Sequence, residues 1–122
     1  MVMLKDNHND YAGGIPKSVA KTKKYLLDNG LDLKIEVETR NLNEVKEALN
    51  AGADIILLDN MPPAKMREAV DLIKGQCVTE ASGGITEENI REIAETGVDY
   101  ISVGALTHSY TSLDMSLKAI LK

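Results

Sequence analysis

The sequence predicts a partial (β/α) barrel, TIM-barrel-like, in which about five parallel strands alternate with helices. The segment 53–60 contains consecutive branched apolar residues at 55–58, which are typical of a strand covered on both faces. Short strands and helices alternate with tight loops, which favours a barrel over a doubly wound sheet. The pattern of residues 51–56, a helix end followed by a strand start, returns at 96–101, an interval of two βα units.

The first predicted strand comprises the apolar residues 1–4. A polar loop is expected at 9–14, followed by a helix with Pro16 in its first turn and a stop at Asn29 and Gly30. The apolar face of this helix is expected to contain Val19, Tyr25, Leu26 and Leu27. Its lysines are interpreted as a solvated outer face rather than a phosphate site, and they are Lys17, Lys21, Lys23 and Lys24.

The second predicted strand, 34–39, alternates polar and apolar residues. Ile35 and Val37 share one face, whereas Glu36 and Glu38 share the other. Because helices cover the outside of a barrel, the glutamates should point into its interior. Buried carboxylates are costly unless they are paired or bind a cation, so these two glutamates require a functional or structural reason.

The remaining elements follow in order. Asn41 is the expected N-cap of a helix at about 43–50, and strand 54–58 leads through 61–63 into a helix ending near Lys74. Strand 77–81 is expected to precede a helix that starts at Thr86, packs Ile90, Ile93 and Ala94 in the core and stops at 96–97. Strand 99–103 and a helix at 113–121 complete the series.

Composition indicates a metabolic protein of the cytoplasm. The net charge of −5 and pI near 5.0 argue against nucleic acid or an anionic membrane as the main partner. The single cysteine, Cys77, excludes an intrachain disulfide and is interpreted as a buried thiol within a strand rather than a nucleophile. The sequence contains no signal peptide pattern and no apolar run near the roughly 20 residues of a membrane span.

Chemically active residues cluster where the predicted strands end. Lys5, Glu38 and Asp59 (with Asn60) end the first three strands, 82–84 follows the fourth and 104–105 follows the fifth. In α/β barrels the carboxyl ends of the strands form the active-site rim. Two neighbouring carboxylates suit a Mg²⁺ ion that carries phosphate oxygens. The glycines, together with the helix expected at Thr86, suit a phosphate group.

Each of these features also has an ordinary structural interpretation. Glycines after a strand are common turn residues, Lys5 can be a surface lysine, Glu38 can pair with Arg40, and His108 can lie in a plain loop. A different catalytic interpretation makes Lys5 the Schiff-base lysine of an aldolase-type barrel, although such lysines usually have apolar neighbours and Asp6 is adjacent. The shared position at strand ends favours the phosphate and Mg²⁺ interpretation.

Five motifs in register resemble a known family. They are residues 5–8, 35–38, 57–61, 81–85 and 103–109, with sequences KDNH, IEVE, LLDNM, ASGGI and VGALTHS. In this order and at these intervals they closely resemble the carboxy-terminal portion of quinolinate phosphoribosyltransferase, also called nicotinate-nucleotide pyrophosphorylase (carboxylating). The resemblance covers essentially the whole chain.

The resemblance implies a pentosyltransferase of de novo NAD synthesis. Such enzymes transfer phosphoribose from phosphoribosyl pyrophosphate to quinolinate, release pyrophosphate and CO₂, form nicotinate mononucleotide and require Mg²⁺. By motif, Lys5 would bind a quinolinate carboxylate, and Glu38 and Asp59 would engage the ribose hydroxyls and the metal-bound pyrophosphate, the metal contact being indirect. The 5′-phosphate would be held by Ser82, Gly83, Gly84, Gly104, Ala105 and His108.

The family pattern also contains parts that this sequence lacks. Members have an amino-terminal domain and earlier barrel strands with basic motifs, so residues 1–122 correspond to the carboxy-terminal part of the barrel domain. We therefore expect a fragment that is inactive alone and that forms a homo-oligomer or associates with the missing part, because its strand edges are exposed. The alternatives are a related barrel enzyme of molybdenum-associated gene clusters and a non-catalytic phosphate-binding or assembly fragment.

Overall fold

The computed structural model describes residues 1–108 and 115. Strands and helices alternate over this part of the chain. The strands are β1 (Val2–Leu4), β2 (Ile35–Thr39), β3 (Ile55–Asp59), β4 (Val78–Ser82) and β5 (Tyr100–Ile101). The helices are α1 (Asp6–Ala12), α2 (Ile15–Asp28), α3 (Leu42–Ala51), α4 (Pro63–Ile73), α5 (Ile90–Ala94) and α6 (Ala105–His108).

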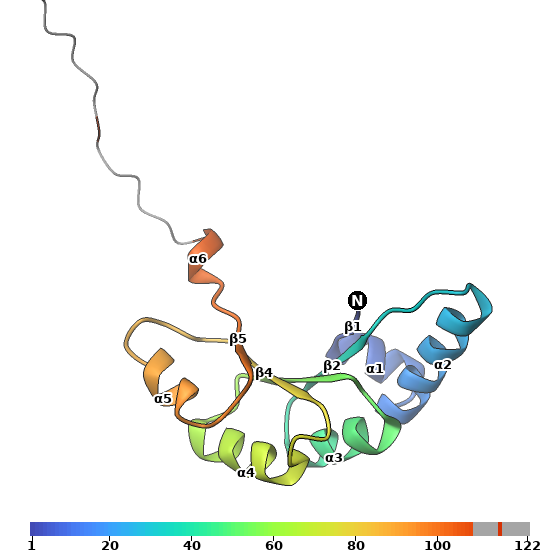
Figure 1. Ribbon diagram of the computed structural model, residues 1–122, viewed down its shortest axis with the longest axis horizontal. Helices are drawn as coiled ribbons and strands as arrows, with labels where there is room; N and C mark the ends of the chain where they lie inside the picture. Colours follow the sequence, from blue (N-terminus) through green and yellow to red (C-terminus); the bar gives the residue numbers. More distant parts are fainter. Residues whose placement is uncertain (109–114, 116–122) are drawn as a thin grey trace, which may run out of the picture.

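The strands form one parallel sheet in the order β1-β2-β3-β4-β5. Helices α2, α3, α4 and α5 form an arc along one side of these strands (Figure 1). Since neighbouring strands in the sheet are also neighbours in the sequence, every crossover turns in the same sense, which is the arrangement of a barrel wall. The predicted partial (β/α) barrel is thereby confirmed.

The hydrophobic core lies between the sheet and this arc of helices. Ile35 and Val37 of β2 and Ile56 and Leu58 of β3 are at most 2% exposed. They belong to one cluster with helix residues that include Val19, Val45, Met66 and Ile73. Because side chains alternate along a strand, Glu36 and Glu38 lie on the opposite face of the sheet, which we call the open face. The expected inward direction of these glutamates is confirmed.

The prediction of a loop at 9–14 is wrong, because residues 6–12 form helix α1. Asn9 is 3% exposed, and its Nδ2 donates to the carbonyl of Leu4. The helix ends at Gly13, which has a φ of 86° and whose N–H donates to the carbonyls of Asn9 and Asp10. Tertiary burial of one asparagine therefore overrides the low helix propensity of this polar segment.

Three smaller expectations also differ from the structure. Tyr25 and Leu27 of α2 are 61% and 81% exposed, so Leu26 and Val19 carry the buried face of that helix. Helix α5 has only five residues, so it buries one of the three side chains that were expected in the core. Ile93 is buried, whereas Ile90 and Ala94 are exposed. Cys77 lies just before β4 and is half-buried, and burial raises the pKa of its thiol.

The last two predicted elements have different outcomes. Strand β5 is present but comprises only Tyr100–Ile101 of the expected 99–103. The helix expected at 113–121 lies outside the residues that the structure describes, apart from residue 115. Within the described part of the chain, no helix has the length and apolar character needed to cross a membrane.

The internal repeat is confirmed at the start of two strands. Asp54 Oδ2 accepts a hydrogen bond from the Ile35 N–H at 2.8 Å, and Asp99 Oδ2 accepts one from the Thr79 N–H at 2.8 Å. The Thr79 hydroxyl donates to the same oxygen of Asp99. The backbone and hydroxyl donors of Thr79 lower the pKa of Asp99. Each aspartate thus fastens its strand to the preceding one at the amino end of the sheet.

Candidate functional site

The predicted site residues meet at the carboxyl edge of the sheet. Lys5 directly follows β1, Glu38 lies near the end of β2, and Asp59 is the last residue of β3. Glu38 is paired in register with Leu57, two positions before Asp59, so both carboxylates are on the open face. Asp59 is in turn paired with Ser82, the last residue of β4. The parallel sheet therefore brings the predicted acidic and phosphate-binding residues to one rim.

Glu38 and Asp59 are half-buried and held by their neighbours. The Asp6 N–H, at the start of α1, lies 3.5 Å from Glu38 Oε1, which is a long hydrogen bond. Asn60 Nδ2 donates to Asp59 Oδ1 at 3.0 Å. Both carboxylates are consequently oriented along the rim while part of each remains accessible.

The alternative pairing of Glu38 with Arg40 is wrong. The Arg40 guanidinium instead lies 3.1 Å from an Asp10 oxygen and 2.9 Å from a Glu44 oxygen. These contacts connect α1 to α3 through Arg40. Glu38 is therefore not paired with the arginine two positions after it in the sequence.

The two rim carboxylates are compatible with Mg²⁺ bound through substrate. Among residues 1–108 and 115, no group of three or more histidine, cysteine, aspartate or glutamate side chains is arranged to hold a metal ion. Mg²⁺ commonly takes one or two carboxylates and completes its coordination with water and phosphate oxygens. Glu38 and Asp59 fit this donor set.

A cavity of about 610 Å³ lies between the ends of β4 and β5, where its lining residue Ser82 is paired with Asp59 of the neighbouring strand. Its lining includes all the predicted phosphate-binding residues, which are Ser82, Gly83, Gly84, Gly104, Ala105 and His108. At Gly104 an added Cβ would lie 2.8 Å from Nε2 of His108, so the imidazole sits directly over this glycine. Glycines allow the backbone of these loops to approach an anion closely, and His108 Nε2 lies beside Gly104 as a further polar group.

The predicted start of a helix at Thr86 is wrong. Residues 86–89 form a turn in which the Thr86 carbonyl accepts from the Ile90 N–H at 3.0 Å, and α5 starts only at Ile90. The Asn89 side chain closes the turn by accepting from the Thr86 N–H. The dipole of a helix beginning at Thr86 therefore does not contribute, and the cavity relies on its glycine loops.

Two further carboxylates on the open face were not among the predicted site residues. Glu36 is 1% exposed, and neither of its carboxyl oxygens has a hydrogen-bond partner among the described residues. Burial, followed by the nearby carboxyls of Glu80 and Glu38, raises the pKa of Glu36 to about 6. Glu80 Oε1 accepts a short hydrogen bond from the hydroxyl of Ser102. Ser102 is one of the residues that line the glycine-containing cavity. The alternation of residues 78–82 would have placed Glu80 on this face.

Lys5 is exposed at the rim, next to Asp6. Its N–H donates to His8 Nδ1 at 3.1 Å, which fixes its backbone at the start of α1. An exposed lysine beside a carboxylate lacks the apolar enclosure that a Schiff-base lysine requires. The geometry therefore argues against the aldolase interpretation.

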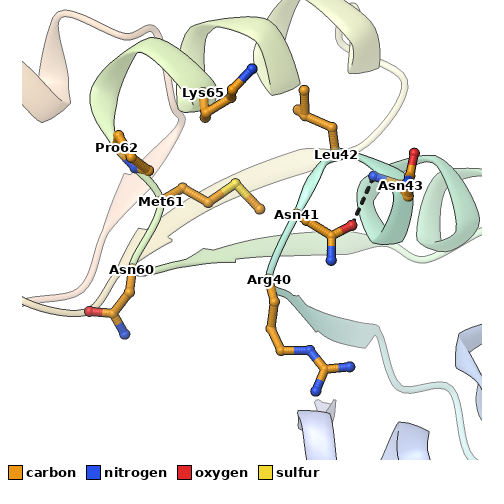
Figure 2. Close-up of a pocket in the computed structure, with 8 residues that line it drawn as sticks. All are labelled: Arg40, Asn41, Leu42, Asn43, Asn60, Met61, Pro62 and Lys65. Carbon is orange, nitrogen blue, oxygen red and sulfur yellow. Dashed lines mark hydrogen bonds between the residues drawn. The ribbon is translucent and has the colours of Figure 1, made fainter.

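A second cavity of about 380 Å³ opens on the outer side of the rim, between the loops that follow β2 and β3 (Figure 2). Its basic side chains, Arg40 and Lys65, are engaged in ion pairs, and Lys65 lies 2.9 Å from Glu68. The lysines of α2 are exposed, as expected for a solvated face. These basic groups are separate from the cavity lined by the glycines.

The comparisons with known proteins agree with this architecture. Residues 1–118 match the family model described as quinolinate phosphoribosyl transferase, C-terminal domain. The chain is 45% identical to quinolinate phosphoribosyltransferase [decarboxylating] 2b, mitochondrial, from Nicotiana tabacum, covering 97% of this chain and 38% of that protein. It is 42% identical to the probable nicotinate-nucleotide pyrophosphorylase [carboxylating] from Bacillus subtilis, covering 98% of this chain and 40% of that protein.

Solved structures give the same result. The NadC structure from Streptococcus pyogenes is 40% identical, with a TM-score of 0.88 over 97% of this chain and 40% of that chain. The nicotinate-nucleotide pyrophosphorylase from Francisella tularensis is 45% identical, with a TM-score of 0.79 over 87% of this chain and 36% of that chain. The chain thus spans less than half the length of the relatives it matches.

Proposed function

Because the chain belongs to the quinolinate phosphoribosyltransferase family, we propose that it forms the part of the enzyme that holds phosphoribosyl pyrophosphate. The reaction transfers phosphoribose to quinolinate and yields nicotinate mononucleotide, pyrophosphate and CO₂ in NAD biosynthesis. The observation that carries this proposal is the meeting of two carboxylates and a glycine-lined cavity on one rim. That arrangement matches a substrate with a ribose between a pyrophosphate and a 5′-phosphate.

Each group has a role that follows from its chemistry. Glu38 and Asp59 orient the ribose hydroxyls and stabilise the positive charge that develops on the ribose ring as its bond to pyrophosphate breaks. Lys5 binds a carboxylate of quinolinate. Mg²⁺, when bound with the substrate, neutralises the leaving pyrophosphate. The cavity at Gly83 and Gly104 binds the 5′-phosphate through backbone N–H groups, so the sugar is held at both ends.

The same geometry argues that the chain binds quinolinate poorly by itself. Among the paired strand residues on the open face, Glu36, Glu38, Asp59 and Glu80 are acidic and none is basic. Quinolinate, a dicarboxylate, would face this acidic surface, and Lys5 is the basic residue predicted to bind it. We therefore propose that the chain alone forms little nicotinate mononucleotide, and measurable turnover by the purified chain would contradict this.

Calorimetry on the purified chain tests the proposal. We expect nicotinate mononucleotide to bind, and pyrophosphate to bind more tightly with Mg²⁺ than without it. Asp59→Asn should weaken the Mg²⁺-dependent binding by about tenfold, since it removes a charged ligand to the complex. Asp71→Asn removes the same charge from an exposed position of α4 and should leave binding unchanged. Absence of binding by the unmodified chain would contradict the proposed function.

We also propose a homo-oligomeric or associated state and a cytoplasmic location. In the described sheet, β1 and β5 each pair with one strand only, so both edges offer unpaired backbone groups to another chain. Light scattering over a concentration series would reveal self-association. The curated relatives from Nicotiana tabacum and Arabidopsis thaliana include proteins named mitochondrial and chloroplastic, so cell fractionation is the appropriate test of location.

A further inference from the structure

Asn60 occupies an uncommon backbone conformation between the two halves of the rim. It follows the last residue of β3 and has φ 50°, in the left-handed region that few residues other than glycine adopt. Its N–H donates to the Ser82 carbonyl at 2.9 Å. This bond extends the pairing of β3 with β4 by one step and fixes the direction of the Asn60 side chain.

The Asn60 side chain contacts both parts of the proposed substrate site. Its Nδ2 donates to Asp59 Oδ1 at 3.0 Å, on the acidic side. On the phosphate side, an added Cβ at Gly83 would lie 2.4 Å from Asn60 Cγ and 2.5 Å from both terminal atoms of the amide. The carboxamide therefore fills the space over Gly83. Figure 2 shows this side chain directed away from Met61 and Pro62.

From these contacts we infer that Asn60 is a positioning residue that sets the spacing between the pyrophosphate end and the 5′-phosphate end of the site. This inference rests on the proposed function. Phosphoribosyl pyrophosphate carries its two anionic groups on opposite sides of one ribose, so both must be met at a fixed separation. A single amide that orients the Asp59 carboxylate and packs on the Gly83 loop links the two positions mechanically.

A purely structural role would give a different outcome. Asparagine tolerates positive φ, and its position in the turn alone would account for its presence. Asn60→Gly separates the two roles, because glycine adopts the same φ without strain and removes only the side chain. The variant should unfold at nearly the same temperature as the unmodified chain. Any change in ligand binding then reports the amide and not the turn.

The first test measures binding of Mg²⁺ with pyrophosphate by calorimetry. Asn60→Gly should weaken this binding by about tenfold, as expected for loss of a hydrogen bond to a charged group. In an Asp59→Asn background the same change should have less than about a twofold effect, because its target carboxylate is gone. Equal effects in both backgrounds, or wild-type affinity of Asn60→Gly, would overturn the inference.

The second test needs no ligand. Gly83→Ala should lower the unfolding temperature of the unmodified chain, both from its φ of 88° and from the clash with Asn60. In the Asn60→Gly background only the backbone strain remains, so the decrease should be clearly smaller. An identical decrease would show that the amide does not pack on Gly83. Failure of the unmodified chain to bind either pyrophosphate or nicotinate mononucleotide would instead refute the proposed function.

Discussion

Replacing Glu36 by glutamine should stabilise the protein above pH 6 and change it little in acid. Glu36 is 1% exposed, and its carboxyl oxygens have no hydrogen-bond partner among the described residues. Burial and the neighbouring Glu80 and Glu38 raise its pKa from 4.5 to about 6. The charged form is therefore the unfavourable one in the folded state.

The sign and size follow from proton linkage. Because the pKa is raised on folding, the folded state binds the proton more tightly than the unfolded state. The resulting stability is fully present below pH 4.5 and is lost as the pH rises through about 6. A rise in pKa from 4.5 to about 6 corresponds to a loss of at most about 2 kcal/mol in the free energy of unfolding, because each pKa unit is equivalent to about 1.36 kcal/mol. Glutamine keeps the shape of the side chain and removes this loss.

Urea unfolding of the unmodified chain and Glu36→Gln between about pH 4 and about pH 8 measures the effect. The free energies of unfolding should agree below pH 4.5, separate in favour of the variant as the pH rises through about 6, and differ by a constant amount above that. Glu47→Gln, on the exposed side of α3, is the control for removing one surface charge. A constant difference between the two proteins at all pH values would refute the argument from burial.

Three further predictions concern the core, the strand starts and the phosphate cavity. Ile56→Ala should lower the free energy of unfolding by roughly 2 to 5 kcal/mol, since this core side chain is 0% exposed; urea titration measures the loss. Asp99→Asn should cost about 1 kcal/mol by weakening two hydrogen bonds from Thr79. Because the pKa of Asp99 is lowered, its contribution falls as the pH drops below 3.8, so acidification should destabilise the variant less than the unmodified chain. Gly104→Ala should weaken nicotinate mononucleotide binding by about tenfold in calorimetry, because its Cβ would lie 2.8 Å from His108 Nε2 and displace the imidazole; unchanged affinity would contradict the assigned role of this glycine.

The sheet was predictable because its pattern is repeated and unambiguous. The apolar run at 55–58 is typical of a parallel strand that is buried on both faces, and the alternation at 35–38 placed two glutamates on the open face. The end-of-strand rule then located Glu38, Asp59 and Ser82 on one rim. These inferences depend on strand period and direction, which the local sequence specifies.

The errors involve side-chain contacts that the periodicity of helices and strands does not reveal. Helix α1 forms in a segment of poor helix formers because Asn9 is buried against the end of β1. The helix expected at Thr86 is preceded by a turn that the Asn89 side chain closes. The contact of Asn60 with Gly83 joins two loops that are distant in sequence, and only the three-dimensional structure reveals it.

Asp54 and Asp99 have a further consequence for how this fold can change. Both fasten neighbouring strands at the amino end of the sheet, opposite to the rim that carries the rest of the chemistry. At β2/β3 and β4/β5 these strand-fastening hydrogen bonds thus lie at the end of the sheet opposite to the proposed substrate site. The rim loops can accumulate substitutions during evolution while the repeated aspartate fastening preserves strand register, so new specificities need not begin with a weakened scaffold.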